Sequence, residues 1–167
     1  MKIRILNIKL LKITFDGLPL FNGKGEIDFT ATQRVTSENA DKMNFLFTQN
    51  NHNFYLNNVL SFIGINASGK TTILKTIVFV CKMLNNESLN NAQYKEIFDG
   101  LQNGQMIDFD VCFYSLKSVY FLHTTIQKGD RLVIIDEILK EKSISKIKNK
   151  NDLFVIDGAK TIMERNN

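Results

Sequence analysis

Apolar and polar residues alternate along several stretches of the chain, as they do in strands that are buried on one face. Between residues 3 and 15 the alternation changes parity after Leu10, which predicts a strand with a bulge or a break. Turn residues occupy positions 16–25, and the alternation resumes over residues 26–30. Residues 3–30 therefore predict an antiparallel pair of strands.

A second group of strand-like runs lies in the C-terminal half. Residues 107–113 alternate cleanly, residues 119–126 are rich in β-branched and aromatic side chains, and residues 132–137 follow a short turn. Connections this short cannot hold a crossover helix, so these runs predict an antiparallel meander. Residues 153–156 predict a last short strand before a polar end over residues 160–167.

The rest of the chain favours helix or loop. Residues 71–84 carry apolar side chains at helical spacing, and residues 87–105 show a weaker helical pattern. Residues 138–151 are rich in lysine and predict a solvated loop or short helix. Residues 31–58 predict a polar loop, in which embedded aromatic side chains either anchor the loop to the core or stack on an adenine ring.

A phosphate-binding motif stands at residues 64–72, which read GINASGKTT and fit Gly-x-x-x-x-Gly-Lys-[Ser/Thr] at every fixed position. The glycines let backbone N–H groups turn inward around phosphate oxygens. The lysine places a positive charge at the β- and γ-phosphates, and the hydroxyl after it suits Mg²⁺. The motif predicts a nucleotide-phosphate site with Mg²⁺, with Thr71 as metal ligand, and the predicted nucleotide-binding residues are Gly64, Asn66, Ala67, Ser68, Gly69, Lys70, Thr71 and Thr72.

The flanking residues supply the context that this motif needs. Residues 59–63 form a short apolar run suited to a buried strand, and the helical pattern of residues 71–84 follows the loop directly. A strand before the loop and a helix after it favour a true phosphate site over a chance glycine-rich turn ahead of a core helix.

The loop resembles that of the ABC-type ATPases, whose pattern is Asn-[Gly/Ala]-Ser-Gly-Lys-[Ser/Thr]-[Ser/Thr], and especially the bacterial AAA family ATPases related to SMC, RecF and OLD proteins. The resemblance implies an α/β P-loop NTPase fold in which residues 1–167 are the N-terminal part of an ATPase head. It also implies that the bound nucleotide is ATP with Mg²⁺, and that ATP is hydrolysed by paired heads or with a second subunit, in DNA maintenance or phage defence. A nucleic-acid partner is consistent with this reading, but no residues point to one.

The run at residues 132–137 has the composition of a Walker B strand, ending in Asp136 and Glu137. A Walker B strand lies parallel to the P-loop strand, whereas this run follows a tight turn and is expected to pair antiparallel. We therefore interpret both carboxylates as structural or surface residues and assign no catalytic residue. The ABC signature loop is also missing from the sequence. Two alternatives stay open: a nucleotide-binding or assembly module that does not hydrolyse, and a compact P-loop enzyme that uses Asp136 and Glu137.

Composition adds little to this picture. The formal net charge of +4 is dispersed and is weak evidence for a nucleic-acid or membrane surface. Cys81 and Cys112 lie in apolar patterns without metal-ligand spacing, which favours reduced core residues in the cytoplasm. No signal peptide and no membrane-spanning run is expected.

Overall fold

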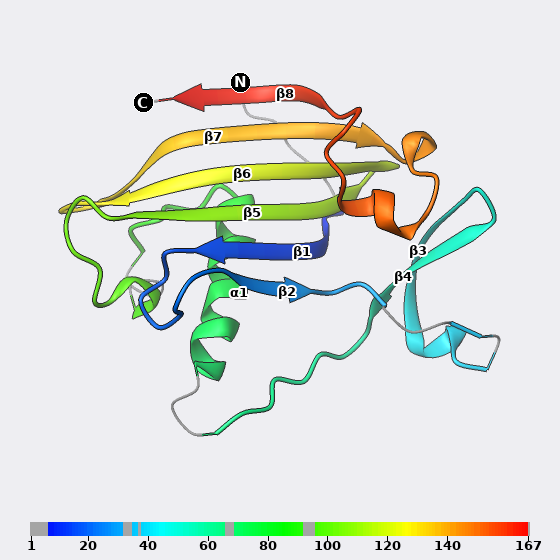
Figure 1. Ribbon diagram of the computed structural model, residues 1–167, viewed down its shortest axis with the longest axis horizontal. Helices are drawn as coiled ribbons and strands as arrows, with labels where there is room; N and C mark the ends of the chain where they lie inside the picture. The colour runs from blue at the N-terminus through cyan, green and yellow to red at the C-terminus, as the bar shows by residue number, and fades with distance from the viewer. Residues whose placement is uncertain (1–6, 32–34, 37, 66–68, 92–95, 167) are drawn as a thin grey trace.

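The computed structural model describes residues 7–31, 35–36, 38–65, 69–91 and 96–166, and its centre is a six-stranded sheet. The strand order is β2-β1-β5-β6-β7-β8, and each pairing is antiparallel (Figure 1). The strands are β1 (Lys9–Asp16), β2 (Gly25–Asp28), β5 (Met106–Ser115), β6 (Ser118–Lys128), β7 (Leu132–Ser143) and β8 (Lys160–Asn166).

One α-helix, α1 (Lys70–Leu84), covers one face of this sheet. Alternation along β5 explains the contact, because Ile107, Phe109, Val111 and Phe113 all point toward α1 and are almost fully buried. Phe79 of α1 packs against this row, with its ring centroid 5.3 Å from that of Phe109. The larger hydrophobic core therefore lies between the sheet and α1.

The described residues cover the opposite face only toward one end of the strands. There a hairpin of β3 (Met43–Gln49) and β4 (His52–Asn57) packs on the sheet, together with a segment that contains the short 3-10 helices η3 (Ile144–Lys146) and η4 (Lys150–Phe154). A third 3-10 turn, η1 (Ala40–Lys42), leads into β3. Phe47 stacks on both Phe54 and Tyr114, with ring centroids 4.5 and 5.2 Å away. The rest of this face stays open, and we call it the open face.

Two β-bulges, one in β1 and one in β7, change which residues of these strands point to each face of the sheet. In β1 the register shifts between Leu10 and Lys12, so Leu11 is extra and is buried under the hairpin. The change of parity predicted at this point is confirmed. In β7 the residue opposite Ile126 is Ile134 and the residue opposite Thr125 is Asp136, which leaves Ile135 as the extra residue.

The predicted fold class is wrong. A P-loop NTPase needs several helices around a parallel sheet. Here the described strands pair only antiparallel, and the described residues contain a single α-helix. The antiparallel pair within residues 3–30 and the meander over residues 107–137 are confirmed, but they belong to one antiparallel sheet and not to the edge of a parallel one.

Several local expectations are also wrong. Residues 31–58 contain the β3–β4 hairpin, and residues 160–166 form the edge strand β8. β7 extends into the lysine-rich region as far as Ser143, and the expected short helix is found only after it, as η3. The expected strand at residues 153–156 overlaps the 3-10 helix η4, whose N-cap Asn149 accepts hydrogen bonds from the backbone N–H groups of Asn151 and Asp152. No α-helix is found in the described residues of the segment 87–105.

Candidate functional site: the glycine-rich loop before helix α1

Helix α1 begins directly after Gly69, which adopts the left-handed conformation with φ of 83°. The first helical hydrogen bond runs from the Ile73 N–H to the Gly69 carbonyl, 2.9 Å away. Gly69 has no side chain to cap the helix, and the first turn carries no acidic residue. The helix start therefore combines a positive dipole end with backbone N–H groups that no side chain of the described residues caps, which suits an anionic ligand.

Lys70 folds back across the loop that precedes it. Its Nζ donates hydrogen bonds to the carbonyl oxygens of Gly64, at 2.7 Å, and Ile65, at 2.6 Å. These bonds bring the ammonium group over the two residues that open the motif. The predicted residues Gly64, Gly69 and Lys70 are thus brought together.

The two threonines differ in their surroundings. Thr71 is exposed at the helix start, whereas Thr72 is half-buried and its carbonyl accepts a 2.8 Å hydrogen bond from Thr76 Oγ1. An exposed hydroxyl directly after the lysine is available to a ligand, as the motif requires. The predicted residues Asn66, Ala67 and Ser68 lie outside the described residues.

Phe21, which the sequence did not single out, lies against the loop. A Cβ atom added to Gly69 would lie 3.4 Å from Cζ of Phe21. The Phe21 ring is itself held edge-on by Phe15, with the centroids 4.9 Å apart. The sequence carries no signal for this contact, because Phe21 stands in a turn 48 residues before Gly69.

The expected strand at residues 59–63 is not present. The segment runs as an irregular chain that pairs with none of the described strands (Figure 1). Val59 is 80% exposed and Ile63 is 96% exposed, so the run is apolar but not buried. The loop therefore has the helix that its motif calls for, without the strand.

The carboxylates of the Walker B-like run lie away from this loop. Glu137 lines a cavity with Met83, which stands thirteen residues after Lys70 in α1. At 1.5 Å per residue, the two ends of that stretch are about 20 Å apart. Asp136 points to the open face, where its Oδ2 lies 3.9 Å from His123 Nε2. The expectation that β7 pairs antiparallel is confirmed, and neither carboxylate reaches the helix start.

Other candidates for chemistry are few. His52 is exposed at the start of β4. Across the described ranges, no group of three or more His, Cys, Asp or Glu residues is placed to hold a metal ion. Burial raises the pKa of the Cys112 thiol and, to a smaller extent, that of Cys81. Neither cysteine is therefore set up as a nucleophile.

Comparison of the chain with protein families, with curated proteins and with solved structures gave no match. The likeness to ABC-type ATPases thus stays a resemblance of a short motif. Within the described part of the chain, no helix has the length and apolar character to cross a membrane.

Proposed function

We propose that residues 64–72 bind the phosphates of ATP together with Mg²⁺. The observation that carries the proposal is the position of Lys70, whose ammonium lies over the Gly64 and Ile65 carbonyls at an uncapped helix start. In this proposal the ammonium moves from these carbonyls to the phosphate oxygens when the nucleotide binds. A phosphate oxygen carries negative charge and a carbonyl oxygen does not, so the ammonium bonds phosphate more strongly, which favours the exchange.

The donor set at the loop fits a nucleotide-bound magnesium ion. Mg²⁺ usually keeps several waters and takes one or two protein oxygens beside the phosphates, and the exposed Thr71 hydroxyl offers one such oxygen. When bound, the metal neutralises phosphate charge. The residues of the chain hold the phosphates: Lys70 by its charge, and the helix start by its N–H groups.

Hydrolysis by this chain alone is not part of the proposal. Turnover requires a group that orients the attacking water. Asp136 and Glu137 lie too far from Lys70 to do so, which disfavours the compact enzyme. The best-supported activity is therefore nucleotide binding without turnover, and an ATP-hydrolysing assembly would need a second head or another subunit. A cytoplasmic location is part of the same proposal.

The test is a titration of the purified chain with a fluorescent ATP analogue and with GTP, with and without Mg²⁺, alongside a phosphate-release assay. We expect Mg²⁺-dependent ATP binding without phosphate release. Lys70→Ala should weaken binding about tenfold or more, the size of a lost hydrogen bond to a charged group. Lys148→Ala is the control, because Lys148 is exposed in the segment between η3 and η4.

The outcomes separate the alternatives. Equal ATP affinity in the Lys70→Ala variant and the parent chain would overturn the site assignment. Steady phosphate release by the parent chain that disappears in Glu137→Gln would show that the Walker B-like carboxylates act after all.

A further inference from the structure

The open face of the sheet contains a groove of about 450 Å³ that the nucleotide proposal does not use. Its floor is one row of side chains across neighbouring strands. Lys12 of β1 is opposite Cys112 of β5, Cys112 is opposite Phe121 of β6, and Phe121 is opposite Lys140 of β7. Neighbouring strands lie about 4.8 Å apart, so the row spans on the order of 14 Å. This volume lies in the range of small-molecule sites.

The wall of the groove is built by the segment that carries η4. Phe154 and Ile156 line the groove, and Leu153 beside them is buried in the hydrophobic cluster that the β3–β4 hairpin forms with the sheet. Lys142, only 3% exposed, donates hydrogen bonds from Nζ to the carbonyls of Asp152, at 3.1 Å, and Val155, at 2.9 Å. These contacts hold the wall in place in the absence of a ligand, so the groove is formed in advance.

The lining is mostly apolar and includes two aromatic rings. Phe121 and Phe154 face the groove with Ile138 and Ile156, and Cys112 lies in the floor. Aromatic side chains offer flat surfaces on which a planar ligand packs well. The apolar part of the groove therefore favours a small aromatic molecule over a sugar or a bare ion.

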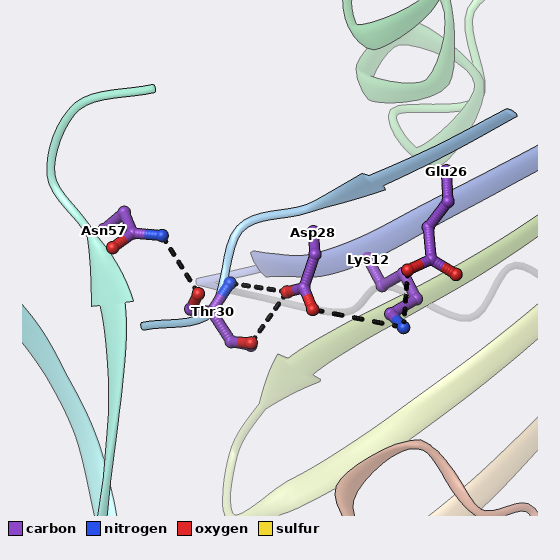
Figure 2. A network of polar contacts seen from close by, with 5 residues as sticks. All are labelled: Lys12, Glu26, Asp28, Thr30 and Asn57. Atoms are coloured by element: carbon purple, nitrogen blue, oxygen red, sulfur yellow. Dashed lines mark hydrogen bonds and ion pairs between the residues drawn. The ribbon is translucent and has the colours of Figure 1, made fainter. Parts of the chain in front are cut away.

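The charged side chains around the groove favour a ligand with a negative charge. Figure 2 shows Lys12 between two carboxylates, with Glu26 Oε1 at 3.0 Å and Asp28 Oδ2 at 4.0 Å. Asp110 lies 2.7 Å from Nδ1 of His123. Lys140, by contrast, has no carboxylate of the described residues within 4.0 Å, although it is half-buried in the groove lining. A ligand with a negative group would provide the ion pair that Lys140 lacks.

We propose that this groove binds a small planar aromatic molecule that carries one carboxylate or phosphate group. The Lys12 ammonium already lies over the Phe154 ring, 4.1 Å from its centroid, so the ligand ring lies against Phe121 and Ile138. Its anionic group pairs with Lys140. The site is independent of the glycine-rich loop, because Cys112 and Phe121 in the groove floor pack with the β3–β4 hairpin, on the opposite side of the sheet from α1. Its ligand and the nucleotide are expected to bind together without competition.

The experiment is a titration of the isotope-labelled full chain with benzoate and with phenyl phosphate, followed by amide chemical shifts. Benzylamine and benzyl alcohol serve as the cationic and neutral probes of matched shape. We expect saturable shifts in the millimolar range or below for both anions, centred on residues 110–123 and 138–140. Benzylamine should produce no saturable shift, and benzyl alcohol should bind more weakly than benzoate.

Variants identify the residues that make the site. Lys140→Met keeps the side-chain stem and should weaken benzoate binding about tenfold, while leaving the affinity for benzyl alcohol unchanged. Ile156→Ala, at the mouth of the groove, should weaken both. Lys24→Met, an exposed lysine in the turn before β2, is the control and should change neither.

A Lys70→Ala arm separates this site from the nucleotide proposal. Phenyl phosphate shifts that persist in Lys70→Ala support the groove, whatever that variant does to ATP binding. The proposal is overturned if benzoate gives no saturable shifts, if Lys140→Met leaves its affinity unchanged, or if the shifts centre on residues 64–72 and vanish in Lys70→Ala.

Discussion

Asp136 and Glu137 are consecutive residues of β7, yet their side chains lie on opposite faces of the sheet. Asp136 faces His123 on the open face, at 3.9 Å, whereas Glu137 pairs with Arg165 Nη2, at 3.0 Å, on the face that α1 covers. In a Walker B pair the aspartate and the glutamate serve the same metal and water. Two side chains separated by the thickness of a sheet cannot do so, which makes the motif-like composition of this strand incidental.

The half-buried position of Glu137 predicts a pH effect on stability. Desolvation raises the pKa of Glu137 above its ordinary value of 4.5, and Arg165 opposes the shift. The folded protein then holds the proton more tightly than the unfolded chain, so the free energy of unfolding falls as pH rises from about 4.5 through the folded pKa. Glu137→Gln cannot titrate, and its unfolding free energy should fall less over this range.

Urea unfolding at a series of pH values measures the effect. Glu164→Gln on β8 removes the same charge from an exposed site and should keep the pH dependence of the parent chain. If the unfolding free energy falls equally with pH in the parent chain and in Glu137→Gln, Glu137 does not contribute to the pH dependence of stability.

Lys142 is a buried lysine whose hydrogen bonds should stabilise the fold. Its Nζ satisfies the carbonyls of Asp152 and Val155, and Lys142→Met keeps the side-chain stem while removing both hydrogen bonds. The loss of the two bonds should lower the free energy of unfolding by about 2 kcal/mol. Urea unfolding reports the loss, and limited proteolysis should show faster cleavage between residues 150 and 156. Lys148→Met, at an exposed position, should leave both unchanged.

Alanine substitutions at Gly69 and Gly100 distinguish a general loss of stability by backbone strain from a specific loss of ATP binding. Both glycines have a positive φ, 83° and 94°, so alanine at either position should cost about 1 kcal/mol of stability. In Gly69→Ala the new methyl group would only touch the Phe21 ring, so the backbone strain falls on the start of α1 and should weaken ATP binding about fivefold, the equivalent of that strain. Gly100→Ala should unfold as easily but bind ATP normally. Equal ATP affinity in both variants would mean that the start of α1 is not part of the site.

The sequence predicted the parts of the fold that depend on local pattern. The parity change near Leu10, the meander over residues 107–137 and the start of α1 each follow from neighbouring residues, and the structure has all three. The β3–β4 hairpin was hidden by its polar and asparagine-rich composition, because only one side of it packs on the sheet. β8 was missed for a similar reason, since an edge strand buries few of its side chains.

For residues 59–63 the error was the opposite one: a strand was predicted there, and the structure has none. Their apolar and β-branched side chains fit a buried strand, but a strand also needs a neighbour to pair with, and this segment pairs with none of the described strands. The candidate site was also predictable only as far as local sequence reaches. Residues within one short motif could be predicted to act together, whereas the contact of Phe21 with Gly69 and the groove lined by Lys12 and Lys140 depend on pairings across the fold.

The bulge at Ile135 gives β7 an unusual tolerance to shortening. Loss of one residue from a strand normally inverts every side chain beyond the loss, sending core residues to solvent. In β7, Ile134 and Asp136 already pair with the adjacent residues Ile126 and Thr125. A chain without Ile135 would keep both halves of the strand in their present pairing and on their present faces. A deletion at this one position of β7 should therefore act like a substitution, because it leaves the faces of all other side chains of the strand unchanged.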